Sequence, residues 1–192
     1  MDLANFLTLV PRGDLWVFGY GSLMWSPEFA HAERKLALVR GYHRALCILS
    51  NRLRGTPEKP GVVMGLCRGG SCWGMAFRIR AAHARHALDG LWQREMINNV
   101  YMPKFVPVSF KDTQRVQALA FVADTSHRQF IKELDLDGRA QLVAQGIGQR
   151  GHCVDYIRNT LNHMKELGMH DPHLSRILDT AVGLASSGKK GK

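Results

Sequence analysis

The chain has 192 residues and a mass of 21.5 kDa, a length typical of one domain that folds without disulfides or a metal. Hydrophobic residues make up 45% and charged residues 22%, and this composition excludes extensive disorder. No apolar run reaches the roughly 18 residues that are needed to cross a bilayer. The formal net charge of +10 makes nucleic acid a partner to consider. The excess of positive charge, however, is spread evenly: residues 1–60, 61–135 and 136–192 carry net charges of +3, +4 and +3. We therefore expect no nucleic-acid partner and no membrane association.

Strand patterns dominate the first two-thirds of the sequence. Residues 15–23, LWVFGYGSL, begin as a short apolar strand and break at a Gly-Tyr-Gly-Ser turn. Residues 35–49 predict a second strand with a bend at Gly41. Residues 62–79 predict a hairpin that turns at RGGS, residues 68–71. Two further strands are expected at 104–110 and 115–123.

Helical patterns interrupt the strands once and then fill the end of the chain. Residues 81–96 predict a helix, and at 100° per residue one of its faces carries Ala81, Ala84, Leu88, Leu91 and Trp92. Three more helices are expected at 138–147, 153–168 and 173–185. This order is unlike the regular alternation of a doubly wound sheet. It predicts an α+β fold with a strongly curved sheet or small β-barrel that carries helices outside.

The ends of the later helices carry their own signals. Gly168 is placed as a C-cap, and Asp171 followed by Pro172 is placed at the start of the last helix. We expect a single domain over residues 15–185, an N-terminal extension at 1–14, and a disordered basic tail at 186–192, SSGKKGK.

The cysteines and the N-terminus indicate a cytoplasmic protein without a metal site. The N-terminus has neither the basic nor the apolar region of a signal peptide. No two cysteines are spaced C-x-x-C and no histidine lies at zinc-ligand spacing from them. We therefore expect reduced, partly buried thiols at Cys47, Cys67, Cys72 and Cys153.

One string imitates a dinucleotide-binding motif. Residues 146–151 read Gly-Ile-Gly-Gln-Arg-Gly, which is G-x-G-x-x-G. The string follows a helical pattern, whereas the nucleotide-binding motif follows a strand and opens a helix. We therefore expect no dinucleotide site.

The turn at the end of the first strand is the first candidate for function. The glycines on either side of Tyr20 allow a sharp turn and let a ligand approach the backbone N–H groups. Such a turn can hold a carboxylate or a developing oxyanion. From the residues alone, this turn can also be an ordinary one that ends the strand and has no function of its own.

Glu95 is the second candidate. It lies three residues after Trp92 and four after Leu91, so it continues the apolar face of the helix at 81–96. Burying a carboxylate is costly unless it is paired, and burial moves carboxyl groups toward the range that suits a general base. The residues alone also allow an ion pair with a buried arginine, or a helix end that turns outward.

Five strings in chain order connect these candidates to a known family. They read WVFGYGSLMW at 16–25, VRGYHR at 39–44, WGMAFRI at 73–79, LWQREMINNVY at 91–101 and GHCVDYI at 151–157. In these strings the sequence resembles the γ-glutamylcyclotransferase superfamily, and most closely its ChaC-like branch. The matches span nearly the whole chain.

The resemblance implies a small mixed β-barrel with surrounding helices, and an enzyme with no cofactor and no metal. Members of this branch cleave glutathione, a small-molecule substrate, to 5-oxoproline and cysteinylglycine. The family's catalytic glutamate falls on Glu95. Its substrate-binding residues fall on Phe18, Gly19, Tyr20, Gly21, Ser22, Leu23, Tyr101 and Tyr156.

The implied chemistry agrees with the two candidates. The α-amine of the substrate attacks its own γ-carbonyl carbon, so Glu95 is expected to take a proton from the amine and return it to the leaving amine. Backbone N–H groups of residues 20–23 are expected to stabilise the oxyanion. Two alternatives stay open: a cyclotransferase for other γ-glutamyl amines or γ-glutamyl amino acids, and a non-catalytic binding module with a basic surface.

Overall fold

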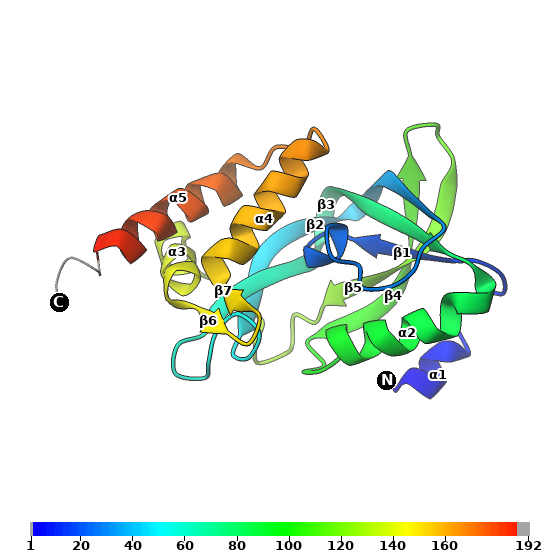
Figure 1. Ribbon diagram of the computed structural model, residues 1–192, viewed down its shortest axis with the longest axis horizontal. Coiled ribbons are helices and arrows are strands. Elements are labelled where there is room, and N and C mark those ends of the chain that lie inside the picture. The colour runs from blue at the N-terminus through cyan, green and yellow to red at the C-terminus, as the bar shows by residue number, and fades with distance from the viewer. Residues whose placement is uncertain (1, 188–192) are drawn as a thin grey trace. The chain divides into compact units, whose positions relative to one another are not determined.

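Five strands close into a barrel within the part of the chain that the structure describes, residues 2–187. In this computed structural model, β1, β3, β2, β4 and β5 follow one another around the barrel (Figure 1). The strands are β1 (Leu15–Gly19), β2 (Glu33–Ser50), β3 (Gly61–Ile79), β4 (Tyr101–Phe110) and β5 (Arg115–Ala123). Closing a sheet on itself removes the exposed edges at which open sheets associate.

The barrel is mixed because β1 runs parallel to β5 and antiparallel to β3. β4 and β5 form an antiparallel hairpin that pairs along nearly their whole length. Residues 118–123 of β5 are all buried, as is usual for a strand covered on both faces. The predicted α+β fold with a small mixed barrel is confirmed.

The chain divides into two compact units. Among the described residues, the first unit comprises 2–44 and 66–124, and the second comprises 45–65 and 125–187. β2 and β3 contribute residues to both. The single domain expected over 15–185 stays a prediction.

The expected hairpin turn at residues 68–71 is absent from the structure, because β3 continues through it from Gly61 to Ile79. Gly69 and Gly70 have φ angles of +97° and +69°. The imidazole of His43 on β2 lies 3.0 Å from the carbonyl oxygen of Gly69. A strand bends at such glycines because they adopt positive φ without strain. The Gly-Gly pair therefore bends a long strand where the sequence pattern suggested a turn.

Helix α2 (Ala81–Glu95) covers the core of the first unit. Its buried side chains include Leu88 and Leu91 from the predicted face, whereas Ala81, predicted on the same face, is exposed. Helix α1 (Leu3–Leu7) packs on the same core through Phe6, which is 1% exposed and stacks on Phe105 with ring centroids 5.7 Å apart. The segment expected as an N-terminal extension therefore supplies a core side chain.

The second unit contains the later helices. They are α3 (Leu136–Gln145), α4 (Cys153–Glu166) and α5 (Pro172–Ser187), and α3 packs against both α4 and α5. Gly168 follows α4 with a φ angle of +74°, and its N–H donates to the carbonyl of Lys165. The carboxylate of Asp171 accepts from the N–H of Leu174 at the start of α5. Both predicted helix boundaries are confirmed.

The G-x-G-x-x-G string forms a two-stranded hairpin of β6 (Ile147–Gly148) and β7 (Gly151–His152). Its glycines allow close contact with the loop that precedes β3. A Cβ atom on Gly146 would lie 2.4 Å from the carbonyl oxygen of Arg54 and 2.6 Å from the Cα of Gly61. The motif serves backbone packing in the second unit and lacks the strand–turn–helix context of a nucleotide site.

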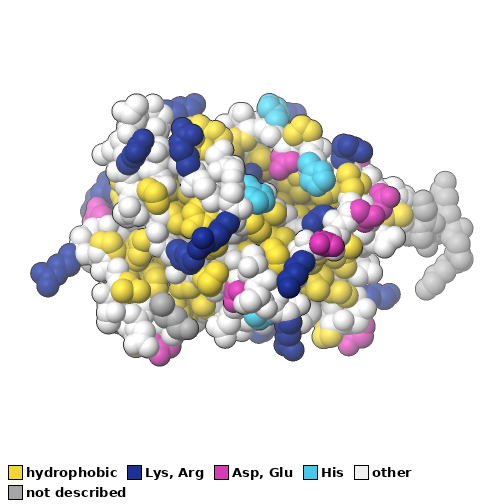
Figure 2. All heavy atoms as spheres, turned by 180° about the vertical axis from the view of Figure 1, so that it is seen from behind, with side chains coloured by type: hydrophobic (Ala, Val, Ile, Leu, Met, Phe, Trp, Pro, Cys, Tyr) yellow, Lys and Arg dark blue, Asp and Glu magenta, His cyan; other side chains and the backbone are white. Residues whose placement is uncertain are grey.

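No helix within residues 2–187 combines the length and apolar character that spanning a bilayer requires. On the face drawn in Figure 2, Lys and Arg side chains are scattered among hydrophobic and uncharged groups, in keeping with the even spread of charge along the sequence. Helix α5 extends to Ser187, and the remainder of the predicted basic tail lies outside the described residues.

We expect Gly146→Ala to destabilise the protein, because the added methyl group needs space that the Arg54 carbonyl occupies. Overpacking of this kind costs about 1–3 kcal/mol of unfolding free energy. Gly90→Ala is the matched control, since a Cβ there meets no atom within 4 Å and Ala favours a helix over Gly by about 1 kcal/mol. Denaturant unfolding measures both variants. A Gly146→Ala variant as stable as the wild type would show that this packing is loose.

Candidate active site

The turn after β1 is built largely from buried residues. Phe18 and Gly19 end the strand opposite Ala76 and Met75 of β3. The chain then enters the short 3-10 helix η1 (Ser22–Met24), in which the N–H of Met24 donates to the carbonyl of Gly21 at 2.9 Å. The side chains of Phe18 and Leu23 are 0% and 6% exposed. These two residues therefore fix the turn by packing.

Tyr20 anchors the turn to two other strands. Its hydroxyl donates to the carbonyl of Phe121 in β5 at 2.6 Å. Its own carbonyl accepts from Nε of Arg44 in β2, and Nη2 of Arg44 donates to the carbonyl of Trp73 in β3 at 2.8 Å. The turn backbone is thereby tied to the wall of the barrel. Arg44 lies in one of the five matching strings, but the sequence analysis gave it no role.

Glu95 is the last residue of α2, and 17% of its side chain is exposed. Its Oε1 lies 3.0 Å from Nε of Arg94, so the ion pair considered from the sequence is present. A carboxylate largely withdrawn from water is tolerated when it is paired in this way. An ionised carboxylate is the form that accepts a proton.

Arg94 joins Glu95 to the turn. Its side chain is 9% exposed, and Nη2 donates to Oγ of Ser22 at 2.9 Å while Nη1 donates to the carbonyl of Ser26 at 2.6 Å. One guanidinium group therefore bonds both functional candidates of the sequence, which are 73 positions apart in the chain. The sequence analysis missed Arg94, because adjacent residues of a helix do not normally face each other.

The two predicted tyrosines lie in different units. Tyr101 begins β4 opposite Ala123, is half-buried, and packs against the core of the first unit. Tyr156 lies on α4 in the second unit, where its hydroxyl oxygen accepts from the N–H of Met64 at 3.1 Å. The structure thus gathers the turn, Glu95 and Tyr101 in one unit, and the part of Tyr156 in the site stays a prediction.

Residues 2–187 show no group of three or more His, Cys, Asp or Glu side chains arranged to hold a metal ion. All four cysteines are buried thiols. Burial raises the pKa of the Cys153 thiol to about 11, and its Sγ lies 3.0 Å from the carbonyl oxygen of Val62. A thiol of this kind stays protonated at neutral pH and is a poor nucleophile.

Comparison with known proteins assigns the chain that carries this site to one family. The sequence profile of the ChaC-like protein family matches residues 15–183. The chain belongs to the ChaC-like family. Its relatives include the Escherichia coli K12 protein named glutathione-specific gamma-glutamylcyclotransferase, which is 33% identical over 178 residues that cover 92% of this chain and 77% of that protein.

Further relatives support the sequence match and the fold. Human glutathione-specific gamma-glutamylcyclotransferase 1 is 33% identical to this ChaC-like protein over 185 residues, 90% of this chain and 82% of the human one. A crystal structure of a yeast gamma-glutamyl cyclotransferase specific to glutathione superposes with a TM-score of 0.83 at 19% identity, covering 90% of this chain and 97% of the yeast chain. The barrel fold is therefore that of the γ-glutamylcyclotransferases.

Proposed function

We propose that this ChaC-like protein is a γ-glutamylcyclotransferase, a lyase that converts glutathione to 5-oxoproline and cysteinylglycine. One observation carries the proposal: the guanidinium of Arg94 bonds both Glu95 and Ser22 of the glycine-flanked turn. A proton acceptor thus lies beside a turn with backbone donors, which is the pair of groups that the reaction needs. We choose glutathione as the substrate because these relatives are named as glutathione-specific.

The reaction is an intramolecular aminolysis. The α-amine of the γ-glutamyl group is mostly protonated at neutral pH, so it attacks only after a base removes a proton. Glu95 is the proposed base. The α-amine nitrogen then bonds to the γ-carbonyl carbon, and the bond from that carbon to the cysteine nitrogen breaks.

The protons balance through the same carboxylate. The α-ammonium group has three protons and the nitrogen of 5-oxoproline keeps one, so two protons pass to the cysteine nitrogen as it leaves. Glu95 accepts and donates them in turn, and it ends the cycle ionised. This scheme uses neither a covalent intermediate nor a redox step.

The turn is the proposed binding element for the γ-glutamyl group. Backbone N–H groups of residues 20–23 stabilise the negative charge that develops on the γ-carbonyl oxygen. We assign substrate binding to Phe18, Gly19, Tyr20, Gly21, Ser22, Leu23, Tyr101 and Tyr156, with Phe18 and Leu23 acting through packing. Because the attack is intramolecular, the main task of these residues is to fold the γ-glutamyl arm into a reactive shape.

The proposed location is the cytoplasm. The four buried thiols fit a compartment that keeps cysteines reduced. Glutathione, the proposed substrate, is the thiol that maintains such a compartment. Fractionation of cells that express the protein tests this location.

Incubation of the purified protein with glutathione is expected to release equal amounts of 5-oxoproline and cysteinylglycine, measured by chromatography. N-acetylglutathione is expected to give no product, because its nucleophile is blocked. Release of cysteinylglycine from the acetylated compound would indicate hydrolysis by water. Activity on other γ-glutamyl amines or γ-glutamyl amino acids, without activity on glutathione, would show that the substrate is one of those compounds. Inactivity on all of them would favour a non-catalytic binding module.

Glu95→Gln is expected to lower kcat at least about 100-fold, because the amide has nearly the same shape but cannot accept the amine proton. Asp89→Asn is the matched control, since Asp89 lies on the same helix and pairs with Arg85 at 3.1 Å. Steady-state kinetics and melting temperatures distinguish catalysis from folding. A folded Glu95→Gln variant with wild-type kcat would remove Glu95 from the mechanism.

Gly21→Ala is expected to reduce kcat/KM at least about tenfold, because the methyl group enters the place where the substrate meets the backbone. Gly21 has a φ angle of −125°, so alanine there meets no left-handed conformation, and melting temperatures measured beside the kinetics separate a change in stability from one in catalysis. Ser22→Ala is the milder comparison, because it removes one hydrogen bond of about 0.5–1.5 kcal/mol and keeps the backbone donors. Unchanged kinetics in Gly21→Ala would show that the turn only ends a strand.

A further inference from the structure

Arg94 has a second carboxylate partner that lies far from Glu95 in the sequence. Oε2 of Glu28 is 3.2 Å from Nη1 of Arg94. The other carboxylate oxygen, Oε1, accepts from the hydroxyl of Ser26 at 3.2 Å. The guanidinium therefore lies between two carboxylates, one at the end of α2 and one in the segment after η1.

The backbone at Glu28 indicates that this arrangement is maintained against strain. Its φ angle is +60°, a left-handed conformation that residues other than glycine seldom adopt. Such conformations are strained and persist where surrounding contacts enforce them, most often at functional sites. The Glu28 side chain contacts Arg94 and Ser26 at this point.

We propose that Glu28 is a positioning residue for the cyclotransferase reaction and acts through Arg94. The inference rests on the proposed function, because it assigns Glu28 a part in the proton transfer by Glu95. Glu28 holds the guanidinium in place while Glu95 changes charge.

The charges around Arg94 change during one turnover. In the resting site Arg94 is balanced by two carboxylates. When Glu95 takes a proton from the substrate amine, it becomes neutral and its attraction for Arg94 weakens. A buried guanidinium without an ionised partner is costly and would move toward water. Glu28 stays ionised, so Arg94 keeps its place and continues to bond Ser22 and Glu95.

The segment that carries Glu28 is attached independently of Arg94. Phe29 packs edge-on against Phe77 with ring centroids 5.7 Å apart, and the N–H of Ala32 donates to the carbonyl of Arg78 at 2.8 Å. The Glu28 side chain is 45% exposed, and a pair with an exposed member contributes little to stability. Removal of the Glu28 charge should therefore leave the fold intact and disturb the reaction.

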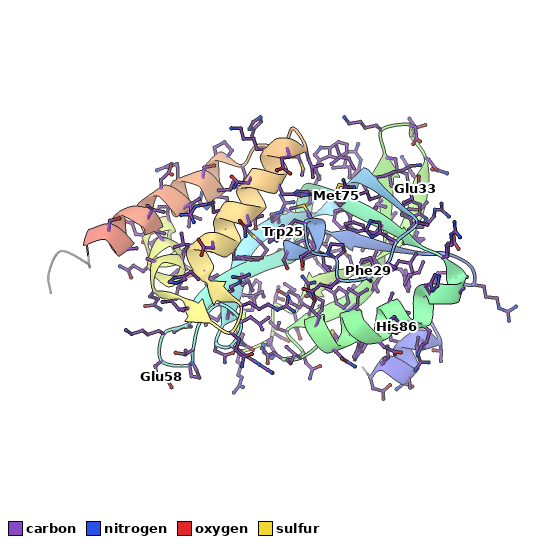
Figure 3. All side chains as sticks on the ribbon, viewed as in Figure 1. Trp25, Phe29, Glu33, Glu58, Met75 and His86 are labelled. Carbon is purple, nitrogen blue, oxygen red and sulfur yellow. The ribbon has the colours of Figure 1, made fainter. Side chains whose placement is uncertain are left out.

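The test compares Glu28→Gln with Glu33→Gln. Glu33 is the matched control, because it also pairs with an arginine, Nε of Arg78 at 2.8 Å, and is similarly exposed. In Figure 3, Glu33 lies well apart from Trp25, which follows η1. Glu28→Asn is a second test variant, since Asn tolerates the left-handed backbone and also removes the charge.

We expect Glu28→Gln and Glu28→Asn to lower kcat for glutathione about tenfold and to change KM less than about twofold, since a misplaced catalytic group slows the step after binding. The melting temperature should fall by less than about 4 °C. Arg94→Lys should lower kcat at least as far, because an ammonium group cannot replace the planar fork. Glu33→Gln should behave as the wild type.

Three results would overturn the inference. If both Glu28 variants keep kcat within twofold of the Glu33→Gln control while the wild type turns over glutathione, Glu28 has no positioning role and the proposed function is unaffected. If the loss appears in KM with kcat unchanged, Glu28 contributes to binding instead. A wild-type protein without turnover would refute the proposed function, and this inference with it.

Discussion

The candidate site depends on a guanidinium group that is withdrawn from water. A charge in that position is tolerated only when it is paired and hydrogen-bonded, and Arg94 bonds two carboxylates, a hydroxyl and a backbone carbonyl. Because the guanidinium is planar and rigid, its partners cannot shift independently of one another. The end of α2 and the segment after β1 therefore keep one relative geometry.

The barrel supplies the frame on which that geometry rests. β1 lies between β3 and β5, so the turn that follows it leaves from a strand held on both sides. Tyr20 bonds back to β5, and Arg44 carries hydrogen bonds from β2 to the turn and to β3. Three strands thus orient the polar groups of the turn. A site that strands hold in this way is positioned more precisely than a site on a free loop.

The local sequence pattern was sufficient to predict the barrel strands and α2. It also marked the turn and Glu95 as candidates for function. It failed where contacts depend on tertiary structure. Arg94 and Glu95 are neighbours in sequence and pair at the end of α2. Glu28 reaches Arg94 from a segment whose course the sequence does not reveal. The Gly-Gly pair in β3 was misread because the same residues serve turns and bent strands.

The burial of every cysteine has a consequence for a protein proposed to work on a thiol. The disulfide of glutathione is attacked by accessible protein thiolates, which forms a mixed disulfide and releases one glutathione thiolate. Cys47, Cys67, Cys72 and Cys153 are all buried, so the fold withdraws each thiol from that exchange. An enzyme built in this way is expected to keep its thiols unmodified as the cellular ratio of reduced to oxidised glutathione falls.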